Sequence, residues 1–286
     1  MWIADNWKEY ELIDTNDGER LERWGKYILR RPDPQVIWKN AALSEKWNNA
    51  DAVYTREGGG GHWSVLNVPD TWNISYRDMR FKVKPMGFKH TGLFPEQAVN
   101  WDWFSGLIKN AGRPVRVLNL FAYTGGASVA AAVAGAEVFH VDAAKNMVAH
   151  AKENAALCGV GDKIRFFVDD CTKFLKYAEK KGIKYDAIIM DPPSYGRGPS
   201  GEIWKLEDEI GDFVALAVNV LSDKPLFFLI NSYSTGLSAS AMSYIMNLTI
   251  VRRFGGKATA DEIGIPVTAT GCALPCGGSA RWQSNK

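Results

Sequence analysis

The sequence predicts an α/β fold, in which a mostly parallel sheet carries helices on both faces and follows a small β-rich subdomain. Two observations predict it. From about residue 113 onward, apolar strand-like runs alternate with helical stretches rich in Ala, Lys and Glu, and the runs are 115–121, 137–141, 164–168, 185–190 and 226–230. Such alternation is typical of βαβ units, which build parallel sheets. The residues before 95 lack this alternation, so we expect one domain over 1–95 and another over 96–286.

The first 95 residues are rich in tryptophan and in turn signals. Short segments such as 63–68 are separated by Arg31-Pro32-Asp33-Pro34 and by the glycine run 58–61. Turn signals at such close intervals favour short strands. We therefore expect a β-rich subdomain here, with one early helix around residues 18–29.

The composition is that of a folded chain. Of the 286 residues, 46% are hydrophobic, and 34 Lys and Arg face 32 Asp and Glu, which argues against disorder. The longest apolar runs, such as 227–230, are far shorter than the roughly 20 residues that span a bilayer. The N-terminus lacks the layout of a signal peptide, and four cysteines are too few for a disulfide framework. We expect a cytoplasmic protein.

The net charge of +2 does not by itself indicate a nucleic-acid partner. Basic residues do gather locally, however. Over residues 77–90, a single acid, Asp78, stands among Arg77, Arg80, Lys82, Lys84 and Lys89. Two interpretations stay open, because lysines at an exposed strand edge prevent pairing with other strands and a basic stretch also suits contact with phosphates.

A buried strand, a tight glycine turn and a helix follow one another over residues 117–128. The turn contains Gly125-Gly126, and the helix is expected to begin near Ala127. In an open α/β sheet such a turn binds ligands, because glycine lets the backbone approach them and the helix start offers unpaired N–H groups. The turn lacks the spaced G-x-G-x-x-G pattern, which disfavours a nicotinamide dehydrogenase.

Acidic residues stand at the ends of the next three strands. Asp142 closes the second strand, Asp169-Asp170 close the third, and Asp191-Pro192-Pro193-Ser194-Tyr195 follows the fourth. The carboxyl ends of parallel strands meet at one crevice, so these acids should converge there. Each aspartate alone is also a common helix cap. Together they favour a ligand site, with Asp142 placed for a ribose diol.

These motifs resemble those of class I S-adenosylmethionine-dependent methyltransferases. The resemblance covers roughly residues 80–235, and it rests on Leu118-Asn119-Leu120-Phe121-Ala122-Tyr123-Thr124-Gly125, Val141-Asp142, Asp169-Asp170 and Asp191-Pro192-Pro193-Ser194-Tyr195. Within the class, the segment 87–97 and the Ser194-Tyr195 pair are similar to the branch that modifies large-subunit ribosomal RNA, including its cytosine-C5 members. The resemblance implies a Rossmann-like sheet with an antiparallel last strand, S-adenosyl-L-methionine as cofactor, and RNA, ribosomal RNA in particular, as partner.

The resemblance also implies residue roles. The turn at 119–126 would hold the methionine moiety, Asp142 the ribose hydroxyls and Asp170 the adenine amine. The expected cofactor-binding residues are Asn119, Phe121, Ala122, Tyr123, Thr124, Gly125, Gly126, Asp142, Ala143, Asp169, Asp170, Cys171 and Asp191. Catalysis is expected at Asp191, Pro192, Pro193 and Tyr195, and substrate binding at Lys89, Ser194, Tyr195 and Arg197.

One position departs from the cytosine-C5 members. Methylation of carbon-5 needs a nucleophile that adds to carbon-6, and those members use a cysteine after the fifth strand. Here Tyr233 stands at the matching place, within Asn231-Ser232-Tyr233-Ser234. A tyrosine is a poor replacement, because its unperturbed pKa lies near 10. The acceptor atom, whether nitrogen, oxygen or carbon, therefore stays open.

Cys272 and Cys276 form a C-x-x-x-C spacing without a second paired motif, so we expect no metal site and interpret 271–278 as a turn between the last two antiparallel strands. Two alternatives to an RNA methyltransferase stay open. The weak overall basicity favours a methyltransferase for a small molecule or a protein. The missing cysteine favours a non-catalytic RNA-binding protein that retains the cofactor pocket.

Overall fold

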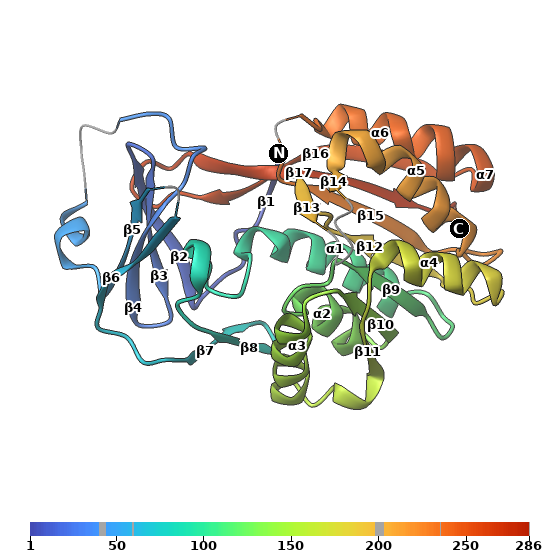
Figure 1. The fold of residues 1–286 in the computed structure, drawn as a ribbon, viewed down its shortest axis with the longest axis horizontal. Coiled ribbons are helices and arrows are strands. Elements are labelled where there is room, and N and C mark those ends of the chain that lie inside the picture. Colours follow the sequence, from blue (N-terminus) through green and yellow to red (C-terminus); the bar gives the residue numbers. More distant parts are fainter. Residues whose placement is uncertain (40–43, 59, 198–202, 235, 286) are drawn as a thin grey trace. The chain divides into compact units, whose positions relative to one another are not determined.

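The computed structural model describes residues 1–39, 44–58, 60–197, 203–234 and 236–285 (Figure 1). The chain divides into two compact units. We call Met1–Val99 with Ile263–Cys276 the N-terminal unit, and Asn100–Glu262 with Gly277–Lys286 the α/β unit. The boundary expected between residues 95 and 96 stays a prediction, and the structure adds residues 263–276 to the N-terminal unit. Within the described residues, no helix combines the length and the apolar character that crossing a membrane requires.

A mostly parallel sheet forms the frame of the α/β unit. The strand order is β1-β16-β17-β15-β12-β9-β10-β11, and β1 with the outer parts of β16 and β17 belongs to the N-terminal unit. The strands are β9 (Arg116–Leu120), β10 (Glu137–Asp142), β11 (Ile164–Val168), β12 (Ala187–Met190), β15 (Phe227–Ser232), β16 (Lys257–Pro266) and β17 (Ala273–Gln283). From β15 to β11 all neighbours are parallel, whereas β17 runs antiparallel to β15. The expected parallel sheet with an antiparallel last strand is confirmed.

Helices pack on both faces of this sheet. They are α1 (Ala98–Lys109), α2 (Gly126–Val133), α3 (Lys145–Leu157), α4 (Cys171–Lys180), α5 (Leu206–Asn219), α6 (Ala239–Met246) and α7 (Arg252–Phe254), with single turns η4 (Gly161–Lys163) and η5 (Asn247–Val251) (Figure 1). The side chains of β9 alternate between the faces, as the pleat requires. Leu118 and Leu120 lie in one buried core with Leu175 of α4 and Val214 of α5. Asn119 points the other way and bonds to α2.

The N-terminal unit is built from short strands. A five-stranded sheet contains β2 (Tyr10–Asn16), β3 (Glu19–Trp24), β4 (Tyr27–Pro32), β5 (Ala52–Glu57) and β6 (Gly60–Leu66), and a hairpin contains β7 (Trp72–Tyr76) and β8 (Met79–Val83). Strand β1 (Trp2–Ile3) pairs with β16, and η1 (Glu45–Asn49), η2 (Gly87–Lys89) and η3 (Pro95–Gln97) are single turns. The expected β-rich N-terminal region is confirmed.

The helix expected at residues 18–29 was wrong, because this segment forms β3 and β4. Asp17 and Gly18 have positive φ angles of 45° and 81°, which is the geometry of a two-residue hairpin turn. Charged residues make up most of β3. Among them Glu22 is fully buried, and Arg31 of β4 donates two hydrogen bonds to it. Charges that pair across strands cannot be distinguished in sequence from charges on a helix surface.

The turn expected at 271–278 lies slightly earlier. The chain reverses between β16 and β17, where Val267 N–H donates to the Cys272 carbonyl over 2.8 Å and Gly271 has a φ of 68°. Cys276 is already part of β17. The tip of this hairpin belongs to the N-terminal unit, where Thr268 N–H donates to the Leu12 carbonyl over 3.0 Å.

Candidate cofactor and acceptor site

The turn after β9 has an unusual backbone. Phe121 and Tyr123 have φ angles of 54° and 51°, and Gly125 has 83°. Positive φ is uncommon for residues other than glycine and is found at ligand sites, where the surrounding structure holds the strained conformation. Here Ala122 N–H donates to the Val141 carbonyl over 3.1 Å. The turn is therefore held in place by the neighbouring strand β10.

Gly125 ends this turn at a position where a side chain would not fit. A Cβ atom built on Gly125 would lie 2.9 Å from Cβ of Ala151 on α3, closer than real Cβ atoms approach. Its positive φ adds to the cost of any other residue. Helix α2 begins at the next residue, so the first N–H groups of α2 stand at the carboxyl edge of the sheet, where an anionic or carboxylate group can be bound.

Asp142 connects the turn to the end of β10. Its Oδ2 accepts a hydrogen bond from Tyr123 N–H over 2.7 Å, and its Oδ1 accepts one from Ala144 N–H over 2.8 Å. Burial raises the pKa of this carboxyl above its ordinary value, and the two backbone hydrogen bonds act in the opposite direction. A carboxylate oxygen can accept more than one hydrogen bond. Asp142 can thus fix the turn and still accept hydroxyl groups of a ribose.

A buried polar chain lies behind the turn. Asn119 donates from Nδ2 to Ser128 Oγ over 2.9 Å, and Ser128 Oγ lies 3.0 Å from His140 Nδ1. Asn119, Ser128 and His140 are all at least 98% buried. On the far side, Asn154 of α3 donates to the Thr124 carbonyl over 2.8 Å. Asn119 therefore supports the turn from its buried side. The expected contact of Asn119 with the methionine moiety stays a prediction.

His140 makes stability dependent on pH. Burial lowers its pKa from 6.5 to about 3, so between these values the unfolded chain binds a proton that the folded chain does not. The stabilisation by the neutral ring is complete above the unfolded pKa and is lost as the pH falls. Between about pH 7 and pH 5, we expect the free energy of unfolding of His140→Gln to decrease by about 2 kcal/mol less than that of the wild type.

Urea unfolding at the two pH values measures this difference, with the exposed His62→Gln as control. Because burial also lowers the pKa of His90, to about 4, part of the pH dependence should survive in His140→Gln. An unchanged pH dependence in His140→Gln would contradict the assignment.

The two acids after β11 have different surroundings. Asp169 is exposed, whereas Asp170 caps α4 by accepting a hydrogen bond at Oδ1 from Lys173 N–H over 2.9 Å. Cys171 is buried at the helix start, and its sulfur accepts a hydrogen bond from Phe121 N–H over 3.3 Å. Burial raises the pKa of the Cys171 thiol, so it stays protonated. Cys171 thus joins α4 to the turn, and the expected adenine contact of Asp170 stays a prediction.

The segment after β12 forms a hairpin beside the turn. Asp191 N–H donates to the Leu120 carbonyl over 3.4 Å, and β13 (Tyr195–Arg197) pairs with β14 (Ile203–Lys205). Trp204 of β14 donates from Nε1 to the Pro193 carbonyl over 2.6 Å, and its ring lies 5.6 Å from the Phe121 ring. Pro192 is buried, and Pro193 and Ser194 are exposed. The side chain of Tyr195 is 50% exposed, which leaves its ring available to a substrate.

Tyr233 lies at the end of β15, the next parallel strand. A Cβ built on Gly277 of β17 would lie 3.0 Å from Cδ1 of Tyr233, so the tyrosine ring packs directly on this glycine. Ser234 then donates to Glu207 at the start of α5 over 2.5 Å. The ring that stands in place of the cysteine therefore has a defined position.

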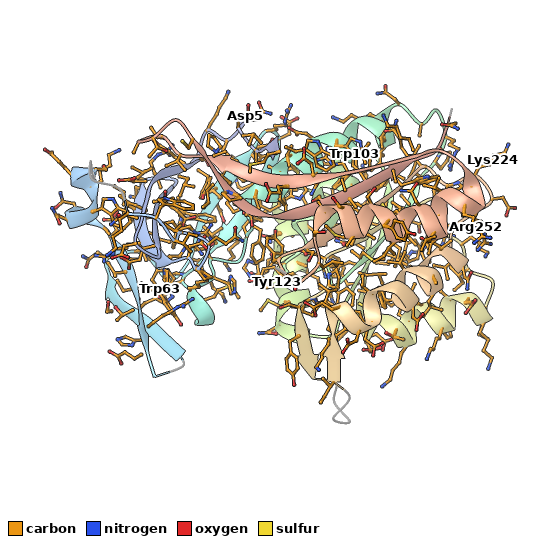
Figure 2. All side chains as sticks on the ribbon, turned by 90° about the horizontal axis from the view of Figure 1, so that it is seen from above. Asp5, Trp63, Trp103, Tyr123, Lys224 and Arg252 are labelled. Carbon is orange, nitrogen blue, oxygen red and sulfur yellow. The ribbon has the colours of Figure 1, made fainter. Side chains whose placement is uncertain are left out.

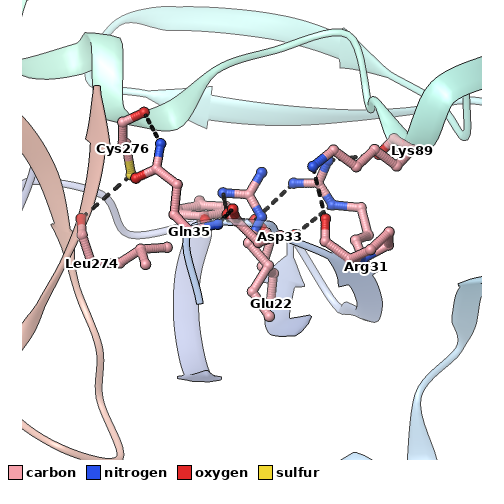
Figure 3. Close-up of polar contacts among 10 residues, drawn as sticks. Glu22, Arg31, Asp33, Gln35, Lys89, Leu274 and Cys276 are labelled. Atoms are coloured by element: carbon pink, nitrogen blue, oxygen red, sulfur yellow. Dashed lines mark hydrogen bonds and ion pairs between the residues drawn. The ribbon is translucent and has the colours of Figure 1, made fainter. Parts of the chain in front are cut away.

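Lys89 belongs to the N-terminal unit, in a buried cluster of charges (Figure 3). Its Nζ donates to the Pro32 carbonyl over 2.8 Å, and its own carbonyl accepts a hydrogen bond from Arg31 over 2.7 Å. Burial, together with Arg20 and Arg31, lowers the pKa of Lys89 to about 8. Burial also disfavours the ionised form of Glu22, but Arg20 and Arg31 outweigh it and hold that pKa at about 2. Lys89 is thus bound within this cluster through Pro32 and Arg31. Its expected contact with substrate stays a prediction.

The predicted residues of the α/β unit lie at adjacent strand ends. Direct hydrogen bonds join the turn at 121–125 to Asp142 and to Cys171, and Asp191 bonds to Leu120, the last residue of β9. Ala143 is exposed after Asp142. Arg197 ends β13, and its side chain lies outside the described part of the structure. The described residues contain no group of three or more His, Cys, Asp or Glu that could hold a metal ion.

Sequence reasoning missed three residues that shape this site, namely Ser128, His140 and Trp204. A histidine within the apolar run of β10 was a signal that could have been followed, because a buried histidine needs a polar partner. Trp204 gave no such signal, since only the hairpin pairing brings it to Phe121.

Comparison with known proteins places these observations in a family. The family model for S-adenosylmethionine-dependent methyltransferases matches residues 41–203. This chain belongs to that family. Its cofactor is S-adenosylmethionine, and the binding of that cofactor by the acids at the strand ends and by the start of α2 stays a prediction.

Three relatives show how far the likeness extends. The crystal structure of an S-adenosylmethionine-dependent methyltransferase from Agrobacterium tumefaciens is 37% identical, with a TM-score of 0.91 over 97% of this chain and 91% of that chain. The ribosomal RNA large subunit methyltransferase K/L of Shewanella frigidimarina is 34% identical over 146 residues, 50% of this chain and 20% of that protein. The protein of the same name from Shewanella sp. strain ANA-3 is 40% identical over 119 residues, 41% of this chain and 16% of that protein. The chain thus spans a fifth or less of the length of these two curated relatives.

Proposed function

We propose that this protein methylates RNA of the large ribosomal subunit in the cytoplasm, with S-adenosylmethionine as methyl donor. The observation that carries the proposal is the hairpin after Asp191-Pro192-Pro193, which contains the half-exposed Tyr195 and contacts the turn through the rings of Trp204 and Phe121. An exposed aromatic ring at this place can stack on a nucleobase. The similarity to two proteins named as ribosomal RNA large subunit methyltransferases supports the same substrate class.

The residues of the chain orient the reactants. The bound cofactor supplies an activated methyl group on a sulfonium, so the enzyme needs mainly alignment and exclusion of water. We propose that Asp142 accepts the ribose hydroxyls and that Asp170, through Oδ2, accepts the adenine amine. Asp191 follows β12 and Asp142 ends β10, and β9 lies between these two strands. The carboxylate of Asp191 would accept a hydrogen bond from the acceptor group and so direct the lone pair of that group toward the methyl.

We propose that transfer proceeds without a covalent enzyme–RNA adduct, to a nitrogen or oxygen atom. The α/β unit has two cysteines among its described residues, Cys158 and Cys171. Cys171 is a buried thiol with a raised pKa. Cys158 follows the end of α3, which begins after Asp142 and runs to the opposite edge of the sheet. At the end of β15 stands Tyr233, and a tyrosine hydroxyl is a weak nucleophile because its unperturbed pKa lies near 10.

Transfer of a labelled methyl group tests the proposal. The full chain is incubated with methyl-labelled S-adenosylmethionine and an unmodified transcript of large-subunit ribosomal RNA, with small-subunit RNA and total cell protein as competing acceptors. We expect label in the large-subunit RNA and no adduct stable to denaturing electrophoresis when the transcript contains 5-fluorocytidine. Label only in protein or in small-subunit RNA would refute the proposed substrate, and a stable adduct would refute the non-covalent route.

A further inference from the structure

Helix α4 has a strongly basic outer face. Over residues 171–184 the chain has five lysines and one acid, Glu179, although the whole protein is nearly neutral. Phe174, Leu175 and Ala178 of α4 are buried in the core. The exposed side chains include Lys173, Lys176, Lys180, Lys181 and Lys184, which we call the lysine face. Lys173, Lys176 and Lys180 recur at the helical spacing of three and four residues and therefore form a continuous row.

The positive charge of this face is not neutralised within the described residues. None of the five lysines makes an ion pair there, and the carboxylate of Glu179 accepts a hydrogen bond from Asn219 over 2.9 Å. Lys184 is bound to a neutral group, since its Nζ donates to the Asn219 carbonyl over 2.6 Å. A row of unpaired lysines attracts polyanions and makes the attraction dependent on salt.

Further basic groups extend the lysine face at its far end. Arg253 of α7 donates to Oδ1 of Asn219 over 3.1 Å. Arg252 (labelled in Figure 2) is exposed beside it. Three acids of α5, namely Glu207, Asp208 and Glu209, lie in its first turn, at the opposite end of that helix from Asn219. Acidic and basic groups are therefore separated along these packed helices, and the basic end is left with a net positive charge.

An aromatic ring stands within the row. Tyr177 is 55% exposed, and Nζ of Lys181 lies 6.0 Å from its ring centre. An exposed ring between lysines suits single-stranded RNA, because a base can stack on the ring while the lysines contact its phosphates. A protein partner with an acidic surface would not require the ring.

The lysine face begins at the candidate site. Asp170 caps α4, and Lys173 N–H is the donor of that capping bond. From Lys173 to Lys180 the helix rises by about 10 Å. A nucleotide at the crevice would thus have its flanking backbone within reach of the first lysines.

We propose that the lysine face and Tyr177 bind the RNA strand that flanks the methylated nucleotide. This inference rests on the proposed RNA substrate and adds where that substrate lies. Lys173 and Lys176 would contact the phosphates nearest to the site, Tyr177 would stack on a flanking base, and Lys180, Lys181 and Lys184 would contact more distant phosphates.

The test compares two double variants of equal charge. Lys176→Gln with Lys180→Gln alters the lysine face, whereas Lys109→Gln with Lys163→Gln removes two exposed lysines elsewhere in the α/β unit. Affinity for the unmodified large-subunit transcript is measured from about 50 to 200 mM salt. Because each lost phosphate contact lowers the salt slope by about 0.7 for single strands, we expect a loss of about 1.4 in the first variant and none in the second. The first variant should bind the RNA about tenfold more weakly at low salt, and both should retain their affinity for S-adenosylhomocysteine.

The binding measurements distinguish failure of the lysine face from failure of the proposed RNA substrate. If the wild type binds the transcript and the lysine-face variant has the same slope and affinity as the control variant, the lysine face is not an RNA site. If the wild type does not bind the transcript at all, the proposed RNA substrate itself is wrong. As a measurement independent of folding, photocrosslinking of wild-type protein to 4-thiouridine RNA should label the peptide that contains Tyr177; crosslinks confined to other peptides would overturn the proposal.

Discussion

Replacement of Asp142 by alanine should reduce the affinity for S-adenosylhomocysteine by at least about 100-fold. The carboxylate would accept two ribose hydroxyls, and a hydrogen bond to a charged group contributes about 1.5–3 kcal/mol. Loss of two such bonds corresponds to a factor of about 10² to 10⁴. The same change also removes the acceptor that holds Tyr123 N–H in the turn. Isothermal titration calorimetry measures the affinity directly.

Asp142→Asn separates the two contributions, because the amide keeps one oxygen that can accept a hydrogen bond. We expect it to bind S-adenosylhomocysteine more tightly than Asp142→Ala but more weakly than the wild type. Asp162→Ala removes an exposed aspartate of η4 and should bind like the wild type. If Asp142→Ala is folded by thermal melting and binds normally, the ribose contact is wrongly assigned.

Replacement of Asp191 by alanine should lower kcat for RNA methylation by about 10² to 10³. This range corresponds to the loss of one oriented hydrogen bond that strengthens in the transition state. Affinity for S-adenosylhomocysteine should change by less than about tenfold, because we propose that the main cofactor contacts lie at the ends of β9, β10 and β11. Single-turnover transfer of labelled methyl to the transcript gives the rate, and calorimetry gives the affinity.

The matched control for Asp191 is Asp223→Ala, an exposed aspartate at the opposite edge of the sheet. It should leave both quantities unchanged. Asp191→Asn keeps an acceptor oxygen and should recover part of the rate. A normal rate in Asp191→Ala, or a loss that lies entirely in cofactor affinity, would show that this carboxylate does not hold the acceptor.

The framework of the α/β unit was predictable because its signals are local. Each parallel strand is an apolar run bounded by a helix, and the residues that close the strands are polar and turn-forming. Asp142 and Asp191 could be placed at the same edge of the sheet from the strand pattern, since the carboxyl ends of parallel strands share one edge. Gly125 indicated the tight turn in the sequence, and the structure gives the reason: its positive φ and the nearby Ala151 leave no room for a side chain.

Features that depend on pairing between distant segments were not predictable in the same way. The sequence does not distinguish Glu22 and Arg31 from ordinary surface charges, because only the pairing of β3 with β4 buries them. Residues 263–276 join the N-terminal unit through bonds to strands about 260 residues earlier in the chain, such as that between Trp2 and Ile263. Trp204 reaches Phe121 through the pairing of β13 with β14. Such contacts are set by topology and not by the local pattern of residues.

Nucleoside mass spectrometry can show whether this protein transfers a methyl group to large-subunit ribosomal RNA in the cell. The RNA of cells that lack the protein is compared with that of cells that produce the wild type, Asp142→Ala or Asp191→Ala. We expect that one methylated nucleoside of the large-subunit RNA is lost on deletion, is restored by the wild type and is not restored by either variant. An identical set of methylated nucleosides with and without the protein would contradict it.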